Sequence, residues 1–403
     1  MIVRLFEFGP LVVWAALLFA FVRPLRLGRA RSCALGAVLL LASQKFLIYK
    51  IFGGDSFVPD LPERFVNFTG WAYSTCMLLF VGVCAWWTVR GCLLLALRIG
   101  ARLKRRERPA APHGALDAQM TRRAFLSMPA VAAGAAAWGI WEGVRVPGVR
   151  ELDVEVYGLP AAFDGFRIAH LSDLHCSPAA RRTRTQGIVD VVNSLNADLV
   201  CITGDFVDGS PEQRMDDLRP LASLRARHGV MGCAGNHEYY HDYAVWRPML
   251  ESLGITMLDN VHRIISRGDA KIAVGGVTDF VAPYNRRRVM EGPDVAKAFA
   301  GAPSDACRIL LQHQPKHVDV NRVWDVRLQL SGHTHGGAIL GFDLLVKAMN
   351  DDHMRGLYHD GKLALYVNSG TGQWAGFPLR LGVPAEIAAL RLRRPPASFT
   401  EVR

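Results

Sequence analysis

The chain has 403 residues, of which 50% are hydrophobic and 21% charged, and its formal net charge is +11. This length provides for one globular domain of about 250 residues and a further region. Much of the basic excess is arginine beside apolar runs near the start, so membrane topology explains it and no nucleic-acid partner is expected. The eight cysteines form no CxxC pair, which argues against a zinc knuckle and a disulfide framework.

Residues 1–108 hold three apolar runs and are expected to form a membrane domain with about three transmembrane helices. The runs are Phe8–Val22, Cys33–Phe52 and Phe68–Leu97, compared with the roughly 20 residues that a span needs. Lys45 lies inside the second run. We expect its side chain to reach the nearer membrane surface; the alternative is that it lines a functional cavity.

The charges between these runs predict the topology. Residues 23–31 and 98–108 are rich in arginine and are expected on the cytoplasmic side, whereas residues 53–64 carry three carboxylates and are expected outside. The chain therefore begins outside and lies inside by Arg108.

Residues 109–149 are expected to form a linker, over 109–119, followed by a fourth hydrophobic segment. Thr121-Arg122-Arg123-Ala124-Phe125-Leu126 and the alanine-rich run to Trp141 resemble a twin-arginine export signal. The alternative is an ordinary fourth transmembrane helix with flanking arginines. Both interpretations deliver the part after Arg150 to the outer face of the membrane.

The sequence predicts that residues 150–403 form an α/β domain, because short apolar runs alternate with segments of helical periodicity. Spacing of 3.6 residues predicts helices near Ile188–Leu195, Met215–Leu224 and Trp246–Leu253. The expected strands are Glu151–Tyr157, Phe166–Leu171, Leu199–Thr203, Gly229–Ala234, Ile255–Leu258, Val261–Ser266, Ile272–Val277, Arg308–Leu311 and Val326–Leu330.

Polar side chains follow five of these strands. Ligand sites of α/β sheets form at such strand ends, so we expect these side chains to meet. Taken singly, each has a plain alternative as a turn residue or a hydrogen-bonded histidine. The residues are Asp173, His175, Asp205, Asn236, His237, Glu238, His313, His333 and His335.

Together these five blocks resemble the calcineurin-like metallophosphoesterase superfamily over residues 150–395. The segments Asn368–Gly372 and Pro378–Ile387 are similar to its bacterial membrane-associated branch, in which Gln usually stands where this chain has Ala338. The resemblance implies a four-layer α/β/β/α sandwich of two mixed sheets, here preceded by transmembrane helices. With the topology predicted from the charges, it leads us to expect a multi-pass protein of the bacterial inner membrane with its catalytic domain on the periplasmic or extracellular side.

The resemblance further implies a role for each matching residue. Asp173, His175 and His335 would hold one divalent metal ion. Asn236, His313 and His333 would hold the second, and Asp205 would bridge the two. His237 would be the catalytic acid beside the leaving oxygen, and Glu238 would orient His237.

Such a site suits the hydrolysis of phosphate esters. Two ions about 3.5–4 Å apart clamp the phosphoryl oxygens and lower the pKa of a bridging water. Nitrogen and oxygen ligands without thiolate suit Mn, Fe or Zn. We therefore expect a membrane-anchored phosphoesterase that uses a bridging hydroxide on mono- or diesters. Phospholipid or cell-envelope esters are the preferred substrates, because a membrane tether brings the enzyme close to them.

The rival hypothesis is a membrane transporter or sensor whose phosphoesterase-like domain only binds a ligand. Two weaker features bear on the substrate. Arg286–Arg288 could meet an anionic substrate or form a solvated face, and apolar residues 341–349 could rest on the bilayer or pack on their own domain. His317 is not expected to be a ligand. The oligomeric state does not follow from the sequence.

Overall fold

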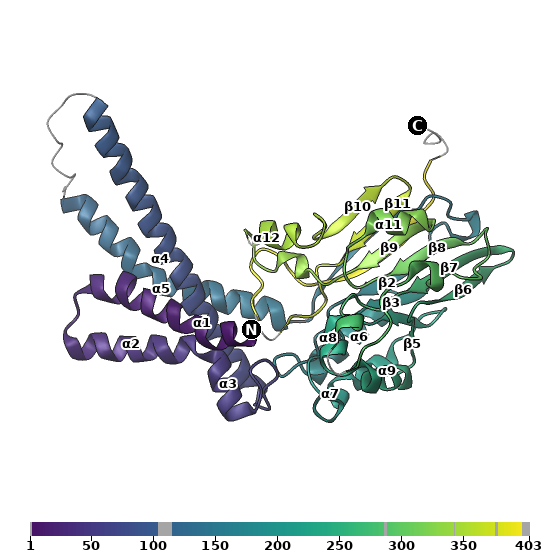
Figure 1. Ribbon diagram of the computed structural model, residues 1–403, viewed down its shortest axis with the longest axis horizontal. Helices are drawn as coiled ribbons and strands as arrows, with labels where there is room; N and C mark the ends of the chain where they lie inside the picture. Colours follow the sequence, from purple (N-terminus) through teal and green to yellow (C-terminus); the bar gives the residue numbers. More distant parts are fainter. Residues whose placement is uncertain (1, 104–114, 286–287, 342, 375–377, 397–403) are drawn as a thin grey trace. The chain divides into compact units, whose positions relative to one another are not determined.

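The computed structural model describes residues 2–103, 115–285, 288–341, 343–374 and 378–396 (Figure 1). They divide into two compact units, Met1–Ile140 and Trp141–Arg403. The division into 1–108, 109–149 and 150–403 remains a prediction. Within the expected linker, residues 109–114 lie outside the described residues, and a helix already begins at Ala115.

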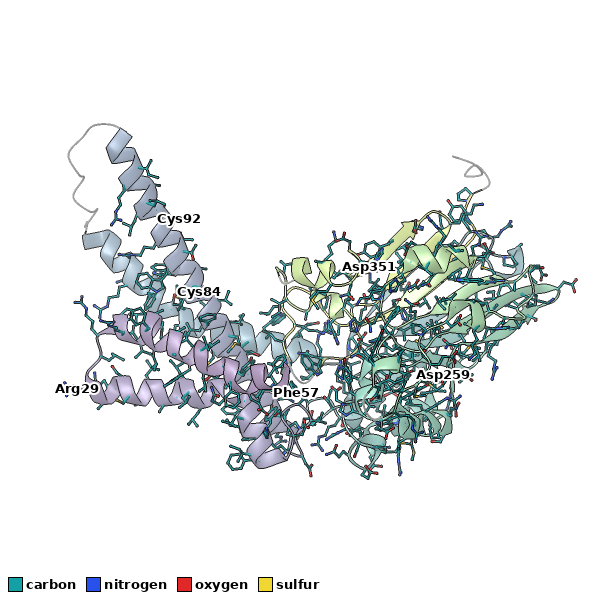
Figure 2. The ribbon with its side chains drawn as sticks, in the orientation of Figure 1. Arg29, Phe57, Cys84, Cys92, Asp259 and Asp351 are labelled. Atoms are coloured by element: carbon teal, nitrogen blue, oxygen red, sulfur yellow. The ribbon has the colours of Figure 1, made fainter. Side chains whose placement is uncertain are left out.

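The first unit is helical. Three described helices are long and apolar enough to cross a membrane, over Phe6–Leu25, Glu63–Gly100 and Arg122–Val144, or up to four if a bent pair counts as one span. Cys84 and Cys92 lie on the exposed surface of the longest helix (Figure 2). The helices are α1 (Ile2–Leu17, continued by short π and 3₁₀ turns to Leu25), α2 (Arg29–Ser43), α3 (Lys45–Gly53), α4 (Glu63–Leu103) and α5 (Ala115–Val144).

The second apolar run is bent rather than straight. Helices α2 and α3 meet at Gln44 at an angle of 65°. Lys45 follows the bend and is only 1% exposed, with Nζ 4.7 Å from the ring centroid of Phe46, 5.3 Å from that of Tyr49 and 5.5 Å from that of Tyr73. The expectation that its side chain reaches the membrane surface was wrong, because aromatic faces inside the unit attract the ammonium group.

The second unit contains two six-stranded mixed sheets. The first has the order β1-β12-β2-β3-β4-β5 and is parallel except where β12 meets β2. The second has the order β10-β11-β9-β8-β7-β6 and is parallel in its centre. The strands are β1 (Gly148–Glu155), β2 (Arg167–Leu171), β3 (Leu199–Thr203), β4 (Val230–Cys233), β5 (Ile255–Met257), β6 (Val261–Arg267), β7 (Ala270–Gly276), β8 (Cys307–Leu311), β9 (Val326–Ser331), β10 (Gly356–Asp360), β11 (Leu363–Val367) and β12 (Glu386–Arg393).

Three buried clusters hold the layers together in the order helix, sheet, sheet, helix. The first joins α6 and α9 to the outer face of the first sheet, with Trp246 fully buried. The second lies between the sheets and includes Cys201 and Leu328. The third joins the outer face of the second sheet to α10 and α11. The helices of this unit are α6 (Arg182–Ser194), α7 (Pro211–Leu218), α8 (Asn236–Tyr240), α9 (Tyr243–Ser252), α10 (Val295–Ala298), α11 (Val318–Val323) and α12 (Asp343–Ala348).

Each strand expected between residues 151 and 330 is present, with ends shifted by a few residues. The helix expected over Met215–Leu224 is shorter. It ends at Leu218, and a 3₁₀ turn covers Arg219–Ser223, because Pro220 lacks the N–H that an α-helix would use.

His170 is a buried histidine in β2. Its Nε2 lies 2.9 Å from the Thr203 hydroxyl, and its Nδ1 has no hydrogen-bond partner among the described residues. Burial lowers the pKa of His170 to about 3, from 6.5. The folded protein therefore keeps this ring neutral at pH values where the unfolded chain protonates it.

His170 should make the protein less stable in acid. Below pH 6.5 the unfolded state binds a proton on His170 that the folded state does not bind. The contribution of neutral His170 to the stability of the folded state is therefore complete above pH 6.5 and is lost as the pH falls towards 3. We expect His170→Gln to flatten the dependence of the unfolding free energy on pH by up to about 1.4 kcal/mol per unit. Urea unfolding followed by circular dichroism between pH 5 and 8 measures this, with the exposed His359→Gln as control. Equal slopes in all three proteins would contradict the prediction.

Candidate metal centre

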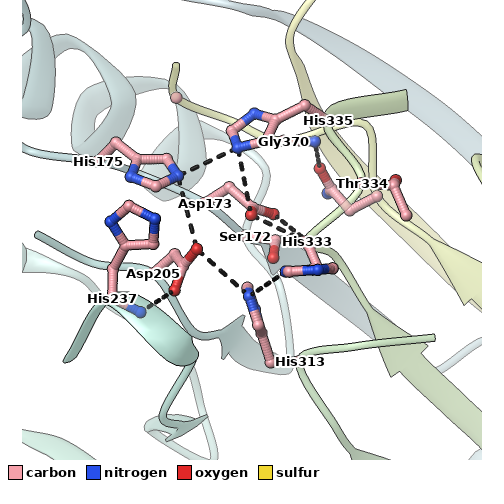
Figure 3. Close-up of polar contacts among 12 residues, drawn as sticks. Ser172, Asp173, His175, Asp205, His237, His313, His333, Thr334, His335 and Gly370 are labelled. Atoms are coloured by element: carbon pink, nitrogen blue, oxygen red, sulfur yellow. Dashed lines mark hydrogen bonds and ion pairs between the residues drawn. The ribbon is translucent and has the colours of Figure 1, made fainter. Parts of the chain in front are cut away.

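The structure brings all seven predicted ligands together at the carboxyl ends of β2, β3, β4, β8 and β9. Figure 3 labels six of them, all except Asn236. Their backbones are unusual: φ is positive at Asp173, His175, Asp205, His333 and His335. Residues other than glycine rarely adopt this left-handed region, and such strain clusters at functional sites. The loops are thus bent at the cost of strain, and the bends turn the side chains towards one point.

The first group contains Asp173, His175 and His335. The two imidazole Nε2 atoms lie 3.1 Å apart, and the Nε2 of His335 lies 3.6 Å from Oδ1 of Asp173. One ligand atom from each of the three residues falls within 4.8 Å of the others. The group has the composition and spacing of a metal site.

The second group contains Asn236, His313 and His333. The Nε2 of His313 lies 3.1 Å from Oδ1 of Asn236 and 3.2 Å from Nδ1 of His333. Asp205 joins the groups, since its Oδ2 lies 3.3 Å from Nε2 of His313 and 3.6 Å from Nε2 of His175. One carboxylate oxygen therefore faces both groups, as a bridging ligand requires.

These donors fit divalent ions. Opposed imidazole nitrogens about 3 Å apart repel each other unless a proton or a cation lies between them. Burial and the charge of His313 lower the pKa of His333 to about 3, and burial with the charge of His175 lowers the pKa of His335. Both rings are therefore in the neutral form that binds metal. The set of nitrogen and oxygen atoms suits Mn, Fe or Zn.

Two glycines allow the loops to approach each other this closely. A Cβ atom at Gly332 would collide with the side chains of Ser172 and Asp173, and one at Gly235 would collide with Asp205. The glycines beside the ligands are therefore needed for space between loops from different strands, and not only for bending the chain.

His237 lies beside this centre at the start of α8. Its Nδ1 is 2.5 Å from Oδ1 of Asp208, and its side chain keeps 16% exposure. Burial lowers the pKa of His237, but the charges of Asp205 and Asp208 outweigh this and raise it to about 9. The neighbouring carboxylates therefore favour the protonated form of this partly exposed ring.

Asp208 is a site residue that the sequence analysis missed. It also lies 3.2 Å from Nδ1 of His175, so one buried carboxylate orients a predicted ligand and the predicted acid. Its position three residues after Asp205, in the same loop, was the available signal.

The expectation that Glu238 orients His237 was wrong, since Asp208 makes that contact. The Glu238 carboxylate instead accepts N–H groups of Asp205 at 2.9 Å, Phe206 at 2.7 Å and Gly235 at 2.8 Å. It therefore fixes the backbone that carries the bridging aspartate.

Arg380 was also missed. Its guanidinium is 1% exposed, lies 3.2 Å from Nδ1 of His335 and donates to the Gly372 carbonyl at 2.7 Å. It supports the loop behind the first group. His317 is in no group of potential ligands among the described residues, and its ring lies against Phe280.

The structure describes only part of the arginine run 286–288 and of the apolar segment 341–349. Arg286 and Arg287 lie outside the described residues, as does Phe342 within the apolar segment 341–349. That segment contains α12, and its last residue, Met349, is 66% exposed.

Comparison with known proteins identifies the class. Residues 166–337 match the family model of calcineurin-like phosphoesterases. An uncharacterized metallophosphoesterase of Helicobacter pylori is 37% identical over 256 residues, 63% of this chain and 66% of that protein. A transmembrane protein with metallophosphoesterase domain from Danio rerio is 34% identical over 266 residues, 64% of this chain and 60% of that protein. The matched part is thus less than two thirds of either relative.

The uncharacterized metallophosphoesterase YkuE of Bacillus subtilis is 29% identical over 290 residues, 68% of this chain and 98% of that protein. Among solved structures, phosphopantetheinyl hydrolase from Mycobacterium tuberculosis aligns with a TM-score of 0.32 and 14% identity, over 50% of this chain and 89% of that chain.

Residues 166–337 of the globular unit are therefore similar to the calcineurin-like phosphoesterases, a family that implies hydrolysis of phosphate esters, and the clustered His and Asp side chains fit the divalent metal ions of such a family. Relatives occur in bacteria and in animals, so the match does not restrict the chain to a bacterial branch. The apolar helices and the transmembrane relatives indicate membrane association.

Asp208 should control the protonation of His237. In the metal-free protein, Asp208→Asn removes one of the three carboxylate charges that raise the pKa of His237, so we expect this pKa to fall from about 9 towards its ordinary value. Nuclear magnetic resonance of selectively labelled histidine rings measures it. The exposed Asp153→Asn serves as control, and an unchanged His237 titration in Asp208→Asn would refute the assignment.

Proposed function

We propose that this protein is a membrane-anchored phosphoesterase with two divalent metal ions, bound by the seven clustered ligands. The observation that carries the proposal is the position of the Asp205 carboxylate, with one oxygen facing both His175 and His313. Asp173, His175 and His335 would hold one ion, and Asn236, His313 and His333 the other. When bound, the ions supply charge for the phosphoryl oxygens and an activated water.

The protein's own groups complete the reaction. His237, protonated through Asp208, donates its proton from Nε2 to the leaving oxygen of the ester, which makes the alcohol a better leaving group. Asp208 keeps Nδ1 of His237 in place, so Nε2 is directed away from the carboxylate. Glu238 and Arg380 hold the loops, and Asp173 and His175 of the first group are themselves buried.

The proposal includes the orientation in the membrane. Arginine-rich segments 23–31 and 98–108 would lie on the cytoplasmic side, and Arg122 and Arg123 at the start of the Arg122–Val144 helix fit the same side. The globular unit would then lie on the outer, periplasmic or extracellular, side. The segment from Thr121 would act as an export signal or as an ordinary span. Membrane tethering favours phospholipid or cell-envelope phosphoesters, as mono- or diesters.

Metal removal and an Asp205 variant test the binuclear centre. We expect about two metal ions per chain, loss of hydrolysis after chelation, and recovery with Mn²⁺. Asp205→Asn keeps the shape of the side chain but removes the bridging charge, so it should lower the metal content and abolish turnover. Elemental analysis and hydrolysis of chromogenic mono- and diesters measure both.

The control for this change is Asp351→Asn, which makes the same substitution at an exposed aspartate that belongs to no group of potential metal ligands among the described residues (Figure 2). A folded protein that binds no metal and hydrolyses neither ester would contradict the proposal and favour the ligand-binding alternative.

A His237 variant tests the proton donor. His237→Gln should retain both metal ions, because His237 belongs to neither proposed ligand set, and should lower kcat by roughly 10²–10⁴. The effect should shrink for esters with acidic leaving groups, which depart without a proton. His359→Gln is the control, and normal turnover of an alkyl ester by His237→Gln would exclude this role.

A further inference from the structure

One pocket of the globular unit has arginines, and none of the seven predicted ligands, in its lining. It has a volume of about 330 Å³, near the lower end of the range typical of small-ligand sites. Three arginines, Arg145, Arg150 and Arg355, face one acidic residue, Glu386, across a lining of small side chains. The lining therefore carries an excess of positive charge and suits an anion.

Of the three arginines, Arg150 and Arg355 remain available to bind an anion. Arg145 is held in a double hydrogen bond by Glu142, at 2.7 and 2.9 Å. The contact of Arg150 with Glu386 is long, at 3.4 Å, while the other Glu386 oxygen accepts from Tyr366. The Arg150 side chain keeps 48% exposure. Its hydrogen bond to Glu386 is thus weak and leaves most of its donors facing solvent.

Arg355 lies next to Arg150. A Cβ atom at Gly356 would be 3.8 Å from Nη2 of Arg150, which places that guanidinium beside the Arg355 backbone. Arg355 donates from Nη1 to the Gly336 carbonyl at 2.7 Å, and no carboxylate of the described residues forms an ion pair with it. A guanidinium has five N–H donors, so Arg355 can bind an oxyanion and keep this bond.

The chain places this pocket close to a bilayer surface. The candidate span ends at Val144, and the pocket is built from Arg145 and Gly148–Arg150 directly after it. Six extended residues reach about 20 Å at most. If α5 crosses the membrane, as proposed above, Arg150 lies within that distance of the end of the span. The phosphate groups of lipids occupy this region.

We propose that the arginine pocket binds the phosphate of an anionic glycerophospholipid, with Arg150 and Arg355 as its donors. This inference rests on the membrane crossing of α5 in the proposed function, but not on the hydrolysis itself. Because Arg355 also bonds Gly336, between His335 and Gly337, the lipid would contact the loop that carries two proposed metal ligands.

The test uses the full-length protein in nanodiscs of a zwitterionic phospholipid with a small fraction of phosphatidylglycerol that has a photoactivatable headgroup. Labelled peptides are identified by mass spectrometry after illumination. We expect labels on residues 145–150, 355 and 382–386. The double variant R150Q/R355Q should lower this labelling at least about tenfold, and Arg150→Gln alone, which keeps the Gly336 contact, should lower it severalfold.

The matched control is Arg308→Gln. Arg308 also donates to a backbone carbonyl of this unit, that of Trp324, at 2.6 Å, but lies outside the pocket. Equal labelling of these segments in the Arg150→Gln and wild-type proteins would overturn the inference. Inorganic phosphate in excess should compete with the lipid and lower this labelling. Binding of inorganic phosphate by these arginines without labelling of the pocket by the lipid would show a site for free phosphate, and would overturn the lipid assignment.

The two proposals fail in different ways. If labelling occurs as expected and the wild-type protein hydrolyses no ester, the enzymatic proposal fails and the lipid site stands. If hydrolysis occurs and the pocket is not labelled, the lipid site alone is wrong.

Discussion

The buried carboxylate of Asp205 is the contact on which the site depends. Its Oδ2 faces His175 and His313, and its Oδ1 accepts the backbone N–H of His237 at 2.9 Å. Burial by itself would raise the pKa of Asp205, but the charges of His313 and His237 hold it well below its usual value. A buried anion therefore persists at the centre of the unit and requires positive charge around it. Divalent ions are the source of charge that this donor set suits best.

The two sheets supply the rigidity that such a centre needs. Bent loops with positive φ at five polar residues are unfavourable by themselves, and persist only where the flanking strands fix both ends. Strand β3 illustrates this, because its five residues are all buried and its successor Gly204 lies against the Gly235 backbone. The hydrophobic cores on both sides of the sheets thus offset the cost of the strained loops at the carboxyl ends of the strands.

Strand ends and their polar successors could be predicted because each signal is local: an apolar run is followed within a few residues by Asp, Asn or His, and after β3, β4 and β9 a glycine comes directly before that residue. Contacts between distant segments could not. Asp208 and Arg380 act through side chains that reach other loops, and Glu238 bonds backbone N–H groups that carry no sequence signature. The bend at Gln44 has no proline or glycine to mark it, and the position of Lys45 depends on which helices pack around it. The terminal strands β10 to β12 are elements that the sequence analysis missed, although Leu390–Arg393 in β12 alternates apolar and basic residues.

Strand β12 has a consequence for how the protein is made. It lies between β1 and β2 in the first sheet, although it is the last strand along the chain. The first sheet therefore cannot close while the ribosome is still synthesising residues before Glu386. Until then β2, which leads to Asp173 and His175, has an open edge. A nascent or prematurely terminated chain would present that edge to other chains, so completion of synthesis decides between a closed domain and an aggregation-prone one.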